Sequence, residues 1–245
     1  MSSRTRVTHD SVQTAGVSRV RSVSGRVLAG VGWRLFMASE RIRGSLPSLS
    51  GDRTIEWAWC LAKLRERPGR VLDFGAGNGF LSLGAALRGH DVVAVDLQPA
   101  AFEYEEPRIE YRQGDLNEMS LEPRSFDQVL NCSTIEHVGL EGRYGSPEAA
   151  DGDLRAMGRL AAVLREDGDM LLTLPLGRDG VFRPYHRVYG ATRLPRLLET
   201  FSVQEESCWA KRDGKRWEEV SRETAIAEEA SASYYALGLF VLRPR

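Results

Sequence analysis

The sequence lacks the features that identify disulfide-rich, zinc-binding and membrane proteins. It has three cysteines, and their odd number and wide spacing indicate neither a disulfide framework nor a zinc site. No apolar run approaches the ~20 residues that a membrane-spanning helix needs. Arg4 and Arg6 are not followed by an apolar stretch or a small-residue cleavage site, which argues against a secretory signal. These absences predict a cytoplasmic protein without a membrane span.

Lysine is also scarce, and arginine carries nearly all of the positive charge. The lysines are Lys63, Lys211 and Lys215, a bias that is typical of a GC-rich bacterial genome. The formal net charge is -1, so the overall charge predicts no nucleic-acid partner. Hydrophobic residues make up 42% of the 245 residues, which is enough for one sizeable core in a globular protein.

The first 50 residues differ from the rest of the chain. Eight arginines occur between Arg4 and Arg43, against Asp10 and Glu40. Residues 1–24 show no apolar period and predict a flexible arm. Residues 26–43 repeat apolar side chains near helical spacing, which predicts a basic amphipathic helix that covers the active site as a lid, or that contacts a membrane or partner. We therefore divide the chain into an N-terminal extension, 1–50, and one domain, 51–245.

Residues 51–245 predict alternating strands and helices in their first part. Strands are expected at 70–74, 91–96, 108–112, 128–131, 170–174, 201–209 and 234–242. Helices are expected from the cap residue Asp52 until Pro68-Gly69 ends the first one, and at 79–88, 148–164 and 194–200. The charged segment 211–232 is expected to be a loop with a helical piece. The order of strand then helix implies an α/β fold, with a parallel sheet and helices on both faces.

A glycine-rich loop follows the first strand and opens the next helix. Gly75, Gly77 and Gly79 allow sharp turns and a close approach of the backbone to a ligand. A dinucleotide-binding loop would need glycine where Phe80 stands, and a phosphate-binding loop would need Gly-Lys-Ser/Thr. The spacing therefore argues against both phosphate-binding motifs.

The segment Val71-Leu72-Asp73-Phe74-Gly75-Ala76-Gly77-Asn78-Gly79 resembles motif I of the class I S-adenosylmethionine (SAM)-dependent methyltransferases. Asp96 matches the acidic residue that ends the second strand in that family, and Gly114-Asp115-Leu116 matches the motif after the third. The resemblance covers about residues 55–205. It implies a Rossmann-like, doubly wound, seven-stranded sheet with an antiparallel C-terminal strand, and SAM as the cofactor.

The resemblance also implies roles for single residues. Asp96 is expected to accept hydrogen bonds from the ribose hydroxyls, and Asp115 from the adenine amine. Leu97 is expected to pack on the adenine, and Asp73 to lie near the methionine amine. The simpler interpretation of Asp73 is a turn-stabilising carboxylate, and that of Asp115 is a turn or helix cap. The expected cofactor-binding residues are Asp73, Gly75, Ala76, Gly77, Asn78, Gly79, Asp96, Leu97, Asp115, Leu116, Asn131 and Cys132.

The methyl acceptor is expected beyond the carboxyl ends of the strands, in the loops after strands four and five. A hydroxyl acceptor must lose a proton, and histidine is the natural base near neutral pH. His137 and His186 lie in these two loops, and Glu136 and Tyr144 complete the expected catalytic set. The runs 136–140 and 143–145 resemble those of small-molecule and sugar-directed bacterial methyltransferases. These features predict methylation of a hydroxyl of a small molecule, either a sugar or a natural-product scaffold.

Other functions remain open on the sequence. Glu136, His137 and His186 could instead hold a divalent metal that chelates the acceptor, but their spacing is no metal motif, and we assign no metal ligand. The acceptor atom could be nitrogen or carbon, and the fold could serve as a SAM-binding module with other chemistry. Methylation of nucleic acid would use the basic extension, and a homodimer stays open.

Overall fold

The computed structural model describes residues 52–102, 104–142, 144, 145, 147–212 and 216–245. The arm and lid helix expected within residues 1–50 lie outside the described residues. Within the described part, no helix is both long and apolar enough to cross a membrane.

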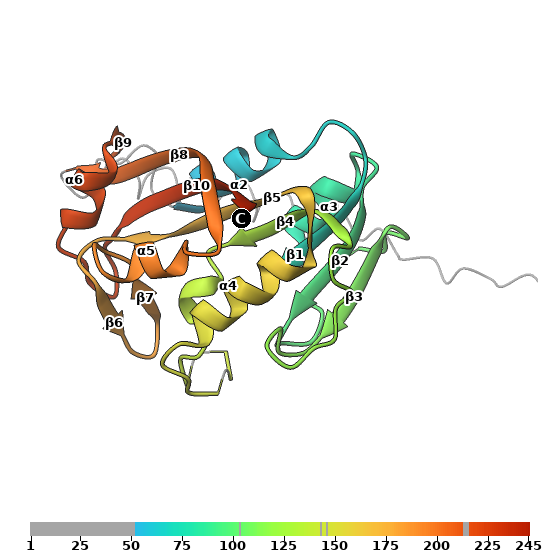
Figure 1. The fold of residues 1–245 in the computed structure, drawn as a ribbon, viewed down its shortest axis with the longest axis horizontal. Coiled ribbons are helices and arrows are strands. Elements are labelled where there is room, and N and C mark those ends of the chain that lie inside the picture. The colour runs from blue at the N-terminus through green and yellow to red at the C-terminus, as the bar shows by residue number, and fades with distance from the viewer. Residues whose placement is uncertain (1–51, 103, 143, 146, 213–215) are drawn as a thin grey trace, which may run out of the picture. The chain divides into compact units, whose positions relative to one another are not determined.

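One mixed sheet forms the centre of the domain (Figure 1), with the strand order β3-β2-β1-β4-β5-β10-β8-β9. The strands are β1 (Arg70–Phe74), β2 (Asp91–Asp96), β3 (Ile109–Gln113), β4 (Phe126–Cys132), β5 (Leu164–Leu176), β8 (Phe201–Arg212), β9 (Arg216–Val220) and β10 (Ala236–Pro244). Strands β3 to β5 in this order are parallel, and β10 is antiparallel to both of its neighbours. The Rossmann-like class and the antiparallel C-terminal strand are confirmed.

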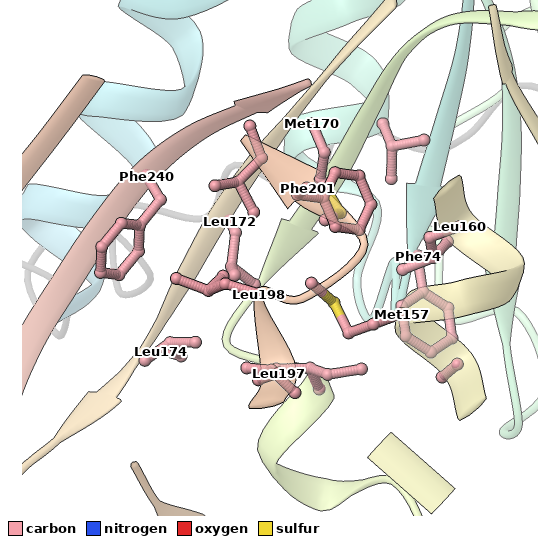
Figure 2. Close-up of a cluster of buried hydrophobic side chains, with 14 of the residues drawn as sticks. Phe74, Met157, Leu160, Met170, Leu172, Leu174, Leu197, Leu198, Phe201 and Phe240 are labelled. Atoms are coloured by element: carbon pink, nitrogen blue, oxygen red, sulfur yellow. The ribbon is translucent and has the colours of Figure 1, made fainter. Parts of the chain in front are cut away.

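Two apolar clusters cover the two faces of this sheet. The larger one joins β4 and β5 to α4 (Gly152–Val163) and α5 (Arg193–Leu197), with Met157 and Leu172 in its middle (Figure 2). The smaller one packs α2 (Asp52–Lys63) and α3 (Phe80–Ala86) on the other face, through Cys60 and Ala85 among others. Buried strand residues alternate between the two clusters, as neighbouring side chains of a strand must.

The sheet has eight strands among the described residues, where seven were predicted. The additional strand is β9, which pairs with β8. It lies within the charged segment 211–232, which we expected to be a loop with a helical piece. Three of its five side chains are exposed and two are half-buried, so no hydrophobic run marked it. The helical piece of that segment is α6 (Arg222–Ala227), which begins at the cap residue Ser221.

A short hairpin also occupies the loop after β5. Strands β6 (Gly180–Phe182) and β7 (His186–Val188) pair with each other outside the main sheet. The hairpin carries His186 and brings the turn residue Tyr185 to the 3-10 helix η2 (Ile135–His137), which follows β4. The loops after strands four and five therefore meet at the carboxyl edge of the sheet, where the sequence placed the acceptor.

Candidate cofactor and acceptor site

The glycine loop is tied to the end of the neighbouring strand β2. The N–H groups of Gly75 and Ala76 donate to the carbonyl oxygen of Val95 at 2.8 and 3.1 Å, and the Gly77 N–H donates to Asp96 Oδ2 at 2.9 Å. Gly79 has a φ of +75°, a backbone conformation that glycine tolerates best. The loop therefore brings its backbone and the Asp96 carboxylate to one place.

The three acidic residues predicted from the motifs have different environments. Asp73 is buried and accepts a hydrogen bond from Ser82 Oγ at 2.6 Å; burial raises the pKa of its carboxyl to about 6, against the lowering effect of that bond. Asp96 Oδ1 accepts from the N–H of Gln98 at 2.9 Å, and Asp115 Oδ1 accepts from the N–H of Asn117 at 2.8 Å. The turn role of Asp115 is therefore present, and each carboxylate keeps lone pairs for a ligand.

A cavity of about 290 Å³ opens in front of the glycine loop. Its lining includes ten of the twelve predicted cofactor-binding residues; Gly79 and Asn131 are not among them. Gly79 instead accepts a hydrogen bond from the Tyr104 hydroxyl at 2.6 Å through its carbonyl oxygen, and Asn131 is fully buried in β4. The structure thus gathers residues from β1, β2, β4 and the loop after β3 around one space.

His137 and Tyr144 line the same cavity at the end of β4. The two rings are 4.8 Å apart in an edge-on arrangement. Nδ1 of His137 lies 2.6 Å from the carbonyl oxygen of Tyr185. Because a carbonyl only accepts, Nδ1 carries the hydrogen and Nε2 holds the lone pair when the ring is neutral.

The other two predicted catalytic residues lie beside the cavity. Neither Glu136 nor His186 belongs to the lining among the described residues. The His186 ring is buried, with ring centres 5.1 Å from Tyr235 and 5.9 Å from Phe182. Glu136 is also buried, and its Oε1 lies 3.6 Å from Nε2 of His137. His137 is therefore the histidine that the structure brings to the cavity.

Helix α2 supplies lining residues that the sequence analysis missed. Arg53 and Trp57 both face the cavity, and the Trp57 ring stacks on Phe80 at 4.3 Å between ring centres. Arg53 Nη1 bonds to Glu56 Oε2 at 2.7 Å and lies 3.9 Å from Cys132 Sγ. The guanidinium is a suitable group for a carboxylate ligand. The spacing of these residues in the sequence predicts that they share one face of a helix. The sequence does not show that this face packs beside the end of β4.

Glu56 joins α2 to β5 and to the residue that follows β4. Its Oε1 accepts hydrogen bonds from the hydroxyls of Ser133 and Thr173, the latter at 2.6 Å. Burial raises the pKa of Glu56, and Arg53 opposes that shift. Ser133 has a φ of +46°, which is uncommon for a residue with a Cβ atom. The network therefore stabilises an unfavourable backbone conformation at Ser133, the first residue of the loop after β4, which we call the acceptor loop.

Burial also dominates the electrostatics of Glu136. It raises the pKa of this carboxyl to about 8, against the lowering effect of a hydrogen bond from the residue's own backbone N–H; Glu56 and Asp52 add to the increase, and Arg53 opposes it. Among the described residues, no group of three or more His, Cys, Asp or Glu side chains is arranged to hold a metal ion.

Two family models match the chain. The model described as "Methyltransferase domain" matches residues 71–146, which contain the glycine loop and His137. The model described as "Caenorhabditis protein of unknown function, DUF268" matches residues 114–239, slightly more than half of the chain. The chain belongs to the DUF268 family and to the class I SAM-dependent methyltransferases. Its cofactor is SAM, as the motif resemblance implied.

Curated relatives of this DUF268 chain are similar over part of their length. A probable SAM-dependent methyltransferase of Mycobacterium tuberculosis is 30% identical over 138 residues, which are 52% of the chain and 46% of the relative. The ubiquinone biosynthesis O-methyltransferase of Alkalilimnicola ehrlichii is 39% identical over 90 residues, which are 33% of the chain and 35% of the relative. The chain thus spans about half of the mycobacterial relative and a third of the second.

Solved structures share the fold of this DUF268 chain. The 1,6-didemethyltoxoflavin-N1-methyltransferase of Burkholderia thailandensis, with bound S-adenosylhomocysteine, has a TM-score of 0.50 and 20% identity, and the match covers 90% of each chain. A protein of Pyrococcus horikoshii has a TM-score of 0.55 and 20% identity, with 79% of this chain and 90% of that chain covered. These similarities support the methyltransferase fold alone.

Proposed function

We propose that this chain transfers a methyl group from SAM to a hydroxyl group of a small molecule, a sugar or a natural-product scaffold. The observation that carries the proposal is the placement of His137. Its ring lines the cavity that begins at the SAM motif, and its Nδ1 lies 2.6 Å from the Tyr185 carbonyl oxygen, so a neutral ring carries its lone pair on Nε2. The O-methyltransferases of ubiquinone biosynthesis among the relatives agree with an oxygen acceptor.

The reaction is an in-line displacement at the methyl carbon. The acceptor oxygen forms the new bond to this carbon while the bond from carbon to sulfur breaks, and the electron pair stays on sulfur. The hydroxyl proton passes to Nε2 of His137. A base in this position typically increases the rate of such a reaction about 10²–10⁴-fold. The cavity increases the rate further by holding the acceptor oxygen in line with the methyl carbon.

The test combines a panel of acceptors with a substitution at His137. We expect the purified chain, incubated with SAM and hydroxylated small molecules, to give a product that is heavier by one methyl group in mass spectrometry. His137→Gln should lower kcat about 10²–10⁴-fold and leave the Kd for SAM in calorimetry nearly unchanged. The matched control is His90→Gln, because His90 lies away from the cavity lining.

Two outcomes would contradict the proposal. Absence of any methylated product with a broad panel would argue for a SAM-binding protein with other chemistry. Full activity of His137→Gln would argue for a nitrogen acceptor, which needs less help from a base.

A further inference from the structure

One buried arginine of the β6–β7 hairpin joins the hairpin to the main chain directly after His137. We propose that Arg187 is a positioning residue for methyl transfer, which holds the His137 ring in place at the cavity. The catalytic meaning of this role rests on the proposed function. The effect on the His137 ring is a property of the folded chain, and it can be measured without an acceptor.

The Arg187 side chain donates to two segments of the chain. The residue is 2% exposed; its Nη1 donates to the carbonyl oxygen of Val138, and its Nη2 donates to those of Gly139 and Ala149, at 3.2 Å each. Because a guanidinium has five N–H donors in a rigid plane, one side chain can hold both segments at a fixed separation. Among the described residues, Val138 lines the cavity and Arg187 does not, so the arginine acts on the site through Val138.

The two segments approach each other closely behind the cavity. Gly139 has a φ of +73°, and a Cβ atom there would lie 2.3 Å from the carbonyl oxygen of Ala149. The carbonyl oxygens of Gly139 and Ala149 also accept from main-chain N–H groups, at 3.0 Å each. Within the described part of the chain, the Val138 carbonyl oxygen accepts from Arg187 alone. Val138, the residue next to His137, therefore depends most on this arginine.

A buried carboxylate balances the charge of Arg187. Asp153, in the first turn of α4, is fully buried, and its Oδ2 lies 3.9 Å from Nε of Arg187. Asp153 also accepts from the Tyr189 hydroxyl at 3.1 Å and from Arg193 Nε at 2.9 Å. A buried charge is costly unless it is paired and hydrogen-bonded, and here the carboxylate and the three carbonyl oxygens together meet that need. The guanidinium is therefore held in one place, where it can restrain its neighbours.

The same hairpin also holds the ring of His137. The carbonyl oxygen of Tyr185, two residues before Arg187, lies 2.6 Å from Nδ1 of the ring. The hairpin thus contacts the ring through Tyr185 and the main chain after it through Arg187. The ion pair of Arg183 with Glu148 joins the hairpin to the acceptor loop as well, but it is exposed, and exposed pairs contribute little. Burial therefore makes Arg187 the stronger restraint.

The first test compares the His137 ring in wild type and in Arg187→Met, which removes the donors and keeps an unbranched side chain. In wild type, nitrogen NMR should show the neutral ring with its hydrogen on Nδ1, because the Tyr185 carbonyl accepts it. In Arg187→Met we expect part of the population to carry the hydrogen on Nε2 instead. Arg183→Met is the control, which removes the exposed ion pair and should keep the wild-type tautomer. The same tautomer in all three proteins would overturn the positioning of the ring.

The second test separates positioning from stability. Arg187→Met should lower kcat about 10²-fold, the effect of a displacement of about 1 Å in a reacting group. It should leave the Kd for SAM in calorimetry nearly unchanged. The stability control is Arg193→Met, which also removes a partner of Asp153 but donates to Ala150 instead of the residues after His137. This control should lower the midpoint of urea unfolding to a similar extent and leave kcat nearly unchanged.

A conservative variant completes the second test. Arg187→Lys keeps the charge but not the planar set of donors, so its kcat should lie between those of wild type and Arg187→Met. It also takes the place of Arg187→Met in both tests if that variant does not fold. A parallel fall of kcat and SAM affinity in Arg187→Met, or an equal loss of kcat in Arg193→Met, would show that the arginine contributes to stability alone. A changed tautomer without methylation of any hydroxyl by wild type would instead overturn the proposed function and keep the positioning of His137.

Discussion

At the residue scale, two glycines of the cofactor loop share a left-handed backbone but differ in the space around them. Gly75 has a φ of +77°, and a Cβ atom there would lie 2.2 Å from Oγ1 of Thr134. Gly77 has a φ of +55°, and a Cβ atom there would meet no atom within 4 Å. Gly75 is therefore required by a close approach of β1 to the acceptor loop, and Gly77 by its backbone conformation.

This difference predicts unequal effects of Gly75→Ala and Gly77→Ala on stability. The left-handed conformation alone costs an alanine about 1–2 kcal/mol, and we expect that loss of unfolding free energy for Gly77→Ala. Gly75→Ala must also displace the Thr134 side chain, and overpacking adds about 1–3 kcal/mol. Urea unfolding without SAM measures both losses, and equal losses for the two variants would refute the explanation.

At the scale of elements, helix α2 is bound to the sheet by more than its apolar face. Glu56 accepts hydrogen bonds from Ser133, just after β4, and from Thr173 within β5. The Tyr235 hydroxyl, before β10, donates to Asp52 Oδ2 at 2.5 Å. The helix thereby connects three strands that are distant in the sequence. It also supplies one wall of the cavity.

Glu56→Ala should therefore destabilise the whole domain. It leaves the Ser133 and Thr173 hydroxyls without their acceptor and Arg53 without its anion, and breaking one partner of a buried polar network costs about 2–4 kcal/mol. Glu205→Ala is the control, because Glu205 forms an exposed ion pair with Lys63 that is worth about 1 kcal/mol or less. Urea unfolding of both variants is the measurement. A loss for Glu56→Ala no larger than that for Glu205→Ala would show that α2 is held by its apolar contacts alone.

The elements also show which parts of the fold the sequence could predict. The strands around the glycine loop were predicted correctly because each is a buried apolar run that ends at a turn. Strand β9 was missed, since three of its five side chains are exposed and, within the described part of the chain, it pairs with β8 alone. The β6–β7 hairpin was missed because each strand has three residues.

The candidate site divides in the same way. Asp96 and the glycines follow from local motif spacing, so sequence alone could place them together. Glu56 and Ser133 are 77 residues apart and meet only after α2 packs on the sheet. The two histidines illustrate the limit, because His137 lines the cavity and His186 turns to Tyr235 instead. Both histidines follow a strand that ends at the same edge of the sheet, so the sequence could not show which of the two rings lines the cavity.

At the scale of the whole molecule, stability depends on pH through three buried acids, Asp73, Glu136 and Glu56, because burial raises the folded-state pKa of each. The folded-state pKa is raised to about 6 for Asp73 and to about 8 for Glu136, in both cases chiefly by burial. Ordinary values for these groups are about 4. Between pH 4 and 8 the folded state therefore binds more protons than the unfolded state, and the unfolding free energy must fall as pH rises through this range.

Urea unfolding at pH 5, 6.5 and 8 should accordingly show a decreasing midpoint. For Asp73 alone the loss has an upper bound of roughly 3 kcal/mol, since one pKa unit corresponds to about 1.4 kcal/mol. Asp179, whose pKa is lowered by backbone N–H bonds, acts in the opposite sense and only at more acid pH. The double variant Asp73→Asn, Glu136→Gln should make the midpoint fall less steeply from pH 5 to 8 than in wild type, because Glu56 alone of the three acids remains. Glu166→Gln, at an exposed position, should not change the slope. A wild-type midpoint that is constant or increases over this range would mean that burial does not keep these acids protonated in the folded chain.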